Sequence, residues 1–305
     1  MIYIGRKLEQ HVGEKIIDYM GNPLEIIEYR AKDDVDVLAF NGMIFNTQYV
    51  TFVNGLKKEM QKIYRNGEEN KNNQGCGMRI INYQDTRHCT IKFDDGTIIK
   101  NVMYSSFKNG SVKNNNFKSI YGVGYYGYGK YTSDYKAYVY WFNMLNRCYN
   151  PKYLKTRPTY LQCSVCEEWH NYQNFAKWFE ENYYEVDDEE MCLDKDIMIK
   201  GNKIYSPDTC VFVTQLINCI FTKGNKTRGE CCIGISIKHN KYQVYVSEYG
   251  KSKPGLHSFD NEYDAFLEYK MEKEKYIKEV ADKYREKIPN RLYQALYKYE
   301  VEFDD

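Results

Sequence analysis

Residues 193–197 read LDKDI, and this stretch decides how the middle of the chain is interpreted. An apolar residue, an acid, a lysine, a second acid and a β-branched residue are typical of a short strand with one charged face. The acidic run EVDDEE at 185–190 precedes it, and residues 161–200 contain 11 acids against three lysines. Such a run usually lies in a solvated loop. Because phosphates need Lys or Arg, the local charge disfavours DNA unless the basic excess at 110–160 supplies that surface.

Length and composition indicate a folded protein of two or three ordinary domains. The 305 residues are 43% hydrophobic, with 14 Phe and 32 Tyr, and the net charge is +1. These values exclude a disordered chain and lack the strongly basic balance of a protein that works mainly on DNA. No apolar run approaches about 18 residues and no signal-peptide core begins the chain, so we expect a cytosolic protein without membrane contact. Its ten cysteines would be free thiols or metal ligands rather than disulfides.

An internal repeat occupies the first 115 residues, with copies that begin at Asn22 and Cys76. The matched positions, 53 to 55 residues apart, are Ile26-Ile27 with Ile80-Ile81, Tyr29 with Tyr83, Phe40 with Phe93, and Phe52–Gly55 with Phe107–Gly110. Alternating apolar residues and the turn signals AFNG (39–42) and FDDG (93–96) predict two small β modules of SH3-like size. Residues 56–73 predict a short helix and a linker between them. Modules of this kind are adaptors more often than enzymes.

A tyrosine- and glycine-rich stretch, YGVGYYGYGKYTSDYKAYVYW, follows at 121–141. Gly122, Gly124 and Gly127 formally satisfy G-x-G-x-x-G, but the apolar strand that precedes a nucleotide-binding loop is missing. We expect a glycine-rich connection with exposed tyrosines, which as an alternative could stack on unpaired bases. Apolar residues then recur at intervals of three and four from Tyr138 to Cys148, which predicts a helix.

Three stretches of the middle region occur in a recognisable order: WFNMLNRCYNPKY (141–153), CSVCEEWHNYQNFAKWFEEN (163–182) and LDKDIMIKGNKIYSPDTCVFVTQLIN (193–218). Over residues 135–222 this order resembles a large group of phage-encoded HNH-endonuclease-like proteins. The resemblance implies a ββα domain in which two strands and a helix surround one divalent ion, Mg²⁺ in an active nuclease. It implies that Asp194 is the metal-ligand position, Lys195 the position of the general base, and Asn218 the helix position, with Asn202 in the turn between. Threonine is a favoured N-cap residue, so Thr214 is expected to cap that helix.

Lys195 departs from the family pattern, which has histidine as the base. The pKa of histidine is about 6.5 and that of lysine about 10.4, so Lys195 would need a downward shift of roughly three units to accept a proton at neutral pH. The flanking Asp194 and Asp196 favour the charged ammonium instead. A lysine here is better suited to contact phosphate or to stabilise charge, which predicts an impaired or repurposed site.

The cysteines of the middle region suggest a structural zinc ion. Cys163 and Cys166 have the C-x-x-C spacing of a zinc knuckle, in which a tight turn brings two thiolates to one ion. Cys148 and Cys210 would complete the set, with His170 as an alternative fourth ligand. The alternative is that these cysteines are simply buried, as cysteines often are. Cys192 and Cys219 are expected to be core residues.

The segment CIGISIKHNKYQVYVSEYGKSKPGLHSFDNEYDAFLEYK (232–270) predicts three short strands and a helix, and it resembles the AP2-like DNA-binding domain at the end of many phage HNH-like proteins. The resemblance implies a sheet that binds the major groove, and the residues on or near it are Lys238, Lys241, Gln243, Tyr245, Lys251 and Lys253. The arginines that usually contact guanine are missing. In the helical remainder, Ile277, Val280, Ala281 and Tyr284 form an apolar stripe. This stripe packs on the chain itself or, alternatively, forms a homo-oligomer through the C-terminal helices.

The expected fold is therefore α+β, with four segments. They are a β module at 1–58, a linker helix with a second β module at 59–118, a Tyr/Gly-rich connection with an HNH-like, cysteine-knuckle domain at 119–224, and an AP2-like sheet with C-terminal helices at 225–305.

Two functions fit these features. The first is a phage accessory protein in the cytoplasm of the infected bacterial host that acts by binding and inhibits a host anti-phage defence complex. A Gabija-type nuclease is the first candidate, chosen from the phage context rather than from a motif. The alternative is an active, metal-dependent, homing-type DNA endonuclease that binds DNA through the AP2-like sheet. The lysine at the base position and the local acidity favour the first.

Overall fold

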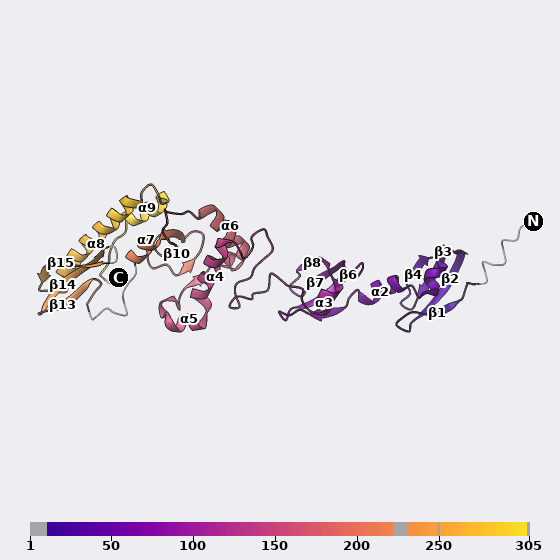
Figure 1. Ribbon diagram of the computed structural model, residues 1–305. Coiled ribbons are helices and arrows are strands. Elements are labelled where there is room, and N and C mark those ends of the chain that lie inside the picture. The colour runs from indigo at the N-terminus through magenta and orange to yellow at the C-terminus, as the bar shows by residue number, and fades with distance from the viewer. Residues whose placement is uncertain (1–10, 222–230, 249–250, 304–305) are drawn as a thin grey trace, which may run out of the picture. The chain divides into compact units, whose positions relative to one another are not determined.

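The computed structural model describes residues 11–221, 231–248 and 251–303, without the side chains of residues 248 and 251–256. Within these ranges the chain is mixed α+β, with several small and mostly antiparallel sheets, as expected (Figure 1). The chain divides into two compact units between residues 117 and 118, next to the expected end of the second β module. None of the described helices is long and apolar enough to cross a membrane.

Each β module is a four-stranded antiparallel meander followed by a short helix. The first module consists of β1 (Lys15–Ile17), β2 (Pro23–Ala31), β3 (Asp34–Ala39), β4 (Ile44–Thr47) and α1 (Tyr49–Val53). The second consists of β5 (Glu69–Lys71), β6 (Gly77–Tyr83), β7 (Cys89–Phe93), β8 (Ile98–Val102) and α3 (Tyr104–Lys108). Helix α2 (Lys57–Arg65) connects the two modules and contacts both of them. Tyr64 donates a hydrogen bond to Asp18 of the first module, and the Arg65 guanidinium lies 3.9 Å from the Tyr104 ring centre of the second.

Equivalent positions in the two sheets are 54 residues apart, as Ile26 and Ile80 are. The buried side chains of the first module at Leu24, Ile26, Val35 and Val37 correspond to Met78, Ile80, Cys89 and Ile91 in the second. Both modules also close their first hairpin in the same way. Oδ1 of the buried Asp18 accepts the amides of Met20 and Asn22, and Oδ1 of the buried Asn72 accepts those of Gln74 and Cys76. The repeat therefore extends to hydrogen bonds in the turns.

One expected match, Phe40 with Phe93, is wrong by one residue. Strand register pairs Leu24 with Ala39 and Met78 with Phe93, so Ala39 is the equivalent of Phe93. Both are buried, whereas Phe40 is 46% exposed and stacks on Tyr64. The match by residue type failed because the first copy has alanine at the buried position and places its phenylalanine one residue nearer the turn.

The central segment is mainly helical and surrounds one large aromatic core. Its elements are α4 (Lys136–Tyr149), α5 (Pro151–Thr156), η2 (Pro158–Tyr160), β9 (Ser164–Val165), η3 (Glu167–His170), α6 (Tyr172–Asn182), β10 (Met191–Asp194), β11 (Ile204–Tyr205), β12 (Val211–Thr214) and α7 (Gln215–Ile220). Trp141 and Trp169 are fully buried in this core, and Trp141 Nε1 donates to the Trp169 carbonyl at 2.7 Å. The Tyr/Gly-rich connection packs on it: a Cβ at Gly124 would meet Leu145 and Trp141, and Tyr126 lies against Tyr172. The expectation that its tyrosines lie exposed holds for Tyr128 and Tyr135 and is wrong for the others, which are half-buried.

The C-terminal segment is a three-stranded antiparallel sheet with a long helix packed against it. The elements are β13 (Ile235–Lys238), β14 (Lys241–Glu248), β15 (Lys251–Phe259), α8 (Glu262–Tyr284) and α9 (Asn290–Tyr297). The first turns of α8 share a buried cluster with Val244 and Val246 of β14. Gly234 before β13 allows the close approach of α8, since a Cβ there would overlap the Tyr269 ring.

The second half of α8 belongs to the core of the central segment. Ile277, Val280, Ala281 and Tyr284 are buried there, together with Leu292 of α9. The apolar stripe of this helix therefore packs on the chain itself and offers no surface for self-association. A homo-oligomer through other faces of the C-terminal helices stays a prediction.

Candidate functional site

The LDKDI stretch begins in a strand–strand–helix unit of the central segment. β10 pairs antiparallel with β12, so that Asp194 lies opposite Val211, and α7 follows β12 directly. Thr214 is the expected N-cap, since its Oγ1 accepts the amide of Ile217 at 3.3 Å. Asn218 is half-buried on α7.

The carboxyl group of Asp194 stabilises the turn after β10. Its Oδ1 accepts the amides of Asp196 at 2.8 Å and Ile197 at 2.7 Å. Asn202 stabilises the same loop, because its Nδ2 donates to the Lys195 carbonyl at 2.7 Å. Removal from water and the nearby charge of Asp196 raise the pKa of Asp194 to about 6, against the lowering effect of the two amides. One oxygen of the candidate metal ligand is thus already used by the backbone.

Lys195 is buried, with only 7% of its surface exposed. Its Nζ lies 3.3 Å from Asp196 Oδ2 and 5.8 Å from the Tyr205 ring centre. Burial lowers the pKa of Lys195, but Asp196 and the neighbouring Cys163 raise it by more, so its pKa lies above the usual lysine value. The side chain at the candidate base position is therefore an ammonium ion at neutral pH, which has no free electron pair to accept a proton.

Arg147 was missed in the sequence; it lies close enough to Tyr160 to lower the pKa of that hydroxyl, as Lys195 also does. It is half-buried on α4, and its guanidinium lies close to the phenols of Tyr205, Tyr160 and Tyr153. Burial lowers the pKa of Arg147, and the surrounding phenols raise it above its usual value. The signal was present in the sequence: RCYNPKYLKTRPTY, from Arg147 to Tyr160, has four cations and no acid.

The four candidate zinc ligands all lie at the central core. Cys148, Cys163 and Cys210 are buried, and Cys166 is partly buried against them. Cys163 lies close enough to Cys148 to raise the pKa of the Cys148 thiol, and Cys166 lies close enough to Cys210 to raise the pKa of the Cys210 thiol, although burial is the larger cause in both. Within residues 11–221, 231–248 and 251–303, no three His, Cys, Asp or Glu side chains form a group that could bind a metal ion. The geometry thus gives two cysteine pairs, and zinc stays a prediction.

The remaining candidate ligands have other partners. His170 Nε2 lies 3.1 Å from the Val165 carbonyl, and burial lowers its pKa, which keeps the ring neutral. Cys192 is half-buried, as a strand residue near the core. Cys219 is exposed, so its expected place in the core is wrong, and it accepts a hydrogen bond from Gln215 Nε2 at 3.2 Å. Cys219 lies on the exposed side of α7, which explains why it is not a core residue.

The C-terminal sheet brings four of the six candidate DNA-binding residues onto one face. Lys238 pairs with Lys241 across the first hairpin, and Gln243 and Tyr245 follow at alternate positions, opposite the helix-facing Val244. The Tyr245 hydroxyl donates to Gln243 Oε1 at 3.0 Å, and Lys241 forms an ion pair with Asp260. In register, Lys251 lies opposite Glu248 and Lys253 opposite Val246, but their side chains are outside the described part of the structure.

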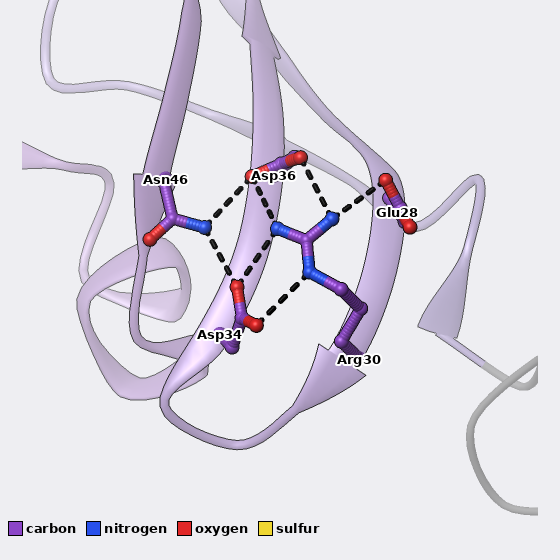
Figure 2. A network of polar contacts seen from close by, with 5 residues as sticks. All are labelled: Glu28, Arg30, Asp34, Asp36 and Asn46. Carbon is purple, nitrogen blue, oxygen red and sulfur yellow. Dashed lines mark hydrogen bonds and ion pairs between the residues drawn. The ribbon is translucent and has the colours of Figure 1, made fainter.

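A second polar cluster lies on the first β module, at the β2–β3 hairpin (Figure 2). Arg30 contacts three carboxylates: Asp34 and Asp36, each with a closest distance of 2.8 Å, and Glu28 at 2.6 Å. Asn46 Nδ2 donates to Asp34 at 2.7 Å and Asp36 at 2.9 Å. The Arg30 hydrogen bonds lower the pKa of Asp34 to about 2 and lower that of Asp36. The network is thus an ordered acidic surface with more carboxylates than cations.

Equivalent positions of the second module do not repeat this network. At the offset of 54 residues they are Asn82, Gln84, His88, Thr90 and Lys100. The acidic cluster is therefore specific to the first module and is not needed for the module fold.

Comparison with known proteins found no matching family model, no matching curated protein and no matching solved structure.

Proposed function

We propose that this chain is a phage accessory protein on a degenerate HNH-like scaffold, and that it acts by binding and inhibiting a host anti-phage defence complex. The observation that carries the proposal is the buried ammonium of Lys195, paired with Asp196, where an active member would have a neutral base. The order β10, β12, α7 supports the ββα scaffold. The three-stranded sheet, packed against α8, supports an AP2-like C-terminal domain.

A surface suited to protein binding lies at one end of the first β module. The turns β1–β2 and β3–β4 meet there, and large apolar side chains are exposed on and beside them: Ile17, Met20, Phe40 and Ile44, between 46% and 69% exposed. We call these four residues the apolar end. Exposed apolar patches of this kind mark interaction surfaces in soluble proteins, and burying each side chain is favourable by roughly 1–2 kcal/mol.

The second module is different at the same place. The equivalents of Ile17, Met20 and Phe40 are Lys71, Gln74 and Asp94, and only Ile98 keeps the apolar character of Ile44. Lys71 and Asp94 line an open hollow of about 770 Å³. Because the two modules share one fold, the apolar end and the acidic network are additions to the first module, which supports a binding role for it.

The acidic network suggests what the partner offers. A nuclease that binds DNA has a basic groove, and the ordered carboxylates of Glu28, Asp34 and Asp36 can compete with phosphates for such a groove. This favours a DNA-binding nuclease as the partner, and a Gabija-type nuclease, chosen from the phage context, is the first one to test. In the test, purified protein should co-elute with the purified defence complex and suppress its DNA cleavage.

The double variant Ile17→Ser/Ile44→Ser should weaken that binding roughly tenfold or more, since two apolar anchors are lost. Its melting temperature should change little, because both side chains are exposed and outside the module core. The matched control is Ile98→Ser, at the position in the second module equivalent to Ile44 and similarly exposed. Equal weakening by both variants would count against the apolar end. A wild-type protein that neither binds nor inhibits the complex would show that this partner is wrong.

The alternative, a metal-dependent DNA endonuclease with Mg²⁺ at Asp194, gains support from one observation. Lys195 is a cation next to Asp194, and Arg147 lies close enough to Tyr160 to lower the pKa of its hydroxyl, as Lys195 does, so two cations of this region partly offset the local acidity. Under the binding proposal, Lys195→His should leave plasmid DNA uncut in Mg²⁺ or Mn²⁺. Cutting by the variant, lost again in Lys195→His/Asp194→Ala, would establish an impaired nuclease and contradict the proposal.

A further inference from the structure

The two β modules have outer sheet faces of opposite charge. In each module the buried side chains alternate along the strands with others that point away from the core and form this outer face. On the first module the charged residues of the face, including the network of Figure 2, have a net charge of −2: Lys15, Arg30, Glu25, Glu28, Asp34 and Asp36. On the second module they have a net charge of +2: Lys71, Arg79, Lys92, Lys100, Glu69 and Asp94. One fold thus carries an acidic face in one copy of the repeat and a basic face in the other.

The reversal of charge occurs at equivalent positions. Strand register aligns one row of outer residues across the four strands of the first module: Lys15, Glu25, Leu38 and Ile44. The second module has their equivalents in the same row: Glu69, Arg79, Lys92 and Ile98. The acid and the cation have exchanged places, a leucine has become a lysine, and an isoleucine ends both rows. The charges are therefore not needed for the module fold.

The basic face has cations without an acidic partner. The ion pairs of the second module within the described residues involve His88 and Lys108, so no cation of its outer face is paired there. Arg79 and Lys92 lie directly opposite each other on neighbouring strands, where like charges are unfavourable. Both border the open hollow of about 770 Å³. An acidic surface placed on this face would relieve the repulsion.

The basic face suits a protein surface better than a nucleic acid. Glu69 and Asp94 line the same hollow as the cations and would repel phosphates. The acidic face of the first module also mixes both signs. Each face has an exposed isoleucine beside its charges, Ile44 at 58% and Ile98 at 52%. A surface that complements the basic face in charge and in apolar content is thus present on every copy of the chain.

We propose that the acidic face of the first module in one copy of the chain binds the basic face of the second module in another copy. Because each chain has both faces, two copies can form both contacts at once and close a two-fold dimer. Four strands about 4.8 Å apart, each roughly five residues long, present a face of about 300 Å². Two such contacts bury roughly 1200 Å² in total, which is at the low end for a specific interface and predicts a weak dimer.

The dimer involves the two β modules alone. It would cover the acidic network, so the basic groove of a host partner would compete with the second module for the same carboxylates. The experiment below contains no host protein, so failure of the dimer and failure of the proposed function are separate results.

Sedimentation equilibrium of the full chain, between about 50 and 500 mM salt, tests the contact. The wild type should self-associate at low salt. Its dissociation constant should rise roughly tenfold or more across this range, because salt screens the charges of the two faces. A wild type that stays monomeric at low salt overturns the proposal, whether or not its basic face binds DNA.

Charge reversal locates the contact. Lys71→Glu/Lys92→Glu makes the outer faces of both modules acidic, and Glu25→Lys/Glu28→Lys makes both basic. Each variant alone should therefore be monomeric at concentrations where the wild type is a dimer. An equimolar mixture of the two should form a dimer again, because every acidic face then meets a basic one, and this restoration also shows that both variants are folded. Self-association kept by either variant alone, or absent from the mixture, overturns the proposal.

The matched control is Lys152→Glu/Lys155→Glu, at two exposed lysines of α5 in the central segment. It changes the net charge by the same amount as Lys71→Glu/Lys92→Glu and should self-associate like the wild type. Mixed with Glu25→Lys/Glu28→Lys, it should form no mixed dimer as strong as that of the two reversed variants. An equally strong mixed dimer would show attraction by net charge alone and contradict the proposal.

Discussion

Replacing Lys273 with methionine should stabilise the protein by about 2 kcal/mol at pH 7. Lys273 is a buried lysine on α8, only 9% exposed, and no ion pair is formed by it within the described residues. Burial lowers its pKa to about 8. At pH 7 the ammonium is present in both the folded and the unfolded chain, so the folded state bears the full cost of its desolvation. Lowering the pKa from 10.5 to about 8 corresponds to a cost of about 3 kcal/mol, and methionine keeps the length of the side chain without the charge.

The pH dependence of this effect has a defined sign. Between pH 8 and about 10.5 the unfolded chain keeps the Lys273 proton while the folded chain has released it. Because the unfolded state then binds more protons, the free energy of unfolding of the wild type rises with pH in this window. The difference between wild type and Lys273→Met should therefore shrink from pH 8 to 10.5.

Chemical denaturation at a series of pH values measures this difference. Lys275→Met is the matched control, because Lys275 is exposed on the same helix and its replacement should change stability by less than about 0.5 kcal/mol. Lys270→Met should be destabilising, since Lys270 pairs with Glu274 at 3.1 Å and donates to the Val301 carbonyl at 2.8 Å. A loss of stability in Lys273→Met would show that the ammonium is held by a favourable partner.

The fold could be predicted where the pattern is local. Two similar stretches with turn signals predicted two β modules, and the structure has a four-stranded meander in each place. Apolar periodicity predicted the helix that ends near Cys148, and α4 ends at Tyr149. The match of Phe40 with Phe93 was wrong because register is set by pairing between strands. Leu24 pairs with Ala39 and not with the neighbouring Phe40.

The long helix α8 shows what local patterns cannot give. Its sequence has apolar residues at helical spacing throughout, so the helix was predictable, but its two halves serve different cores. The assignment of Tyr276 and Ile277 to the central core depends on contacts with residues about a hundred positions away, such as the Tyr284 hydroxyl with Glu189 at 2.6 Å. No window of sequence contains both partners. The burial of Lys273, near the change from one core to the other, could not be predicted for the same reason.

The candidate site divides in the same way. Asp194 and Lys195 became candidates because the LDKDI stretch takes the place of the metal-ligand strand in the resemblance to HNH-like proteins. Arg147 was missed because it is far from both in sequence and comes near Lys195 only around Tyr160 and Tyr205 in the fold. The acid-free run after Arg147 was a signal in the composition of the sequence. The proximity of Arg147 to Tyr205 could be recognised only in the folded structure.

Asp194→Asn should stabilise the protein by about 1–2 kcal/mol at pH 7, and Asp194→Ala should be less stable than Asp194→Asn by about 2 kcal/mol. The asparagine keeps an oxygen that can accept the amides of Asp196 and Ile197, and it removes a carboxylate that burial disfavours. The alanine also removes the charge, but it leaves both amides without their acceptor. The two variants thus separate the charge of Asp194 from its role in the turn.

The charge effect should depend on pH. The pKa of Asp194 is raised to about 6, against about 3.9 in the unfolded chain, so between these values the folded state binds more protons. The free energy of unfolding of the wild type therefore falls as pH rises from about 4 to 6. The advantage of Asp194→Asn should be absent below pH 4 and complete above pH 6. Denaturation at pH 4 and pH 7 measures it.

Measuring the stability of wild type and Asp194→Asn with divalent ions distinguishes the binding function from the endonuclease function. If Asp194 binds Mg²⁺ or Mn²⁺, the ion compensates its charge, and adding it should raise the melting temperature of the wild type but not of Asp194→Asn. The wild type would then become the more stable protein in the presence of the ion. Under the binding proposal the ion should leave the order unchanged, because Oδ1 is occupied by the turn and the described residues around Asp194 form no metal-binding group. A metal-dependent reversal of the order would therefore contradict the binding proposal, even if no DNA cleavage were detected.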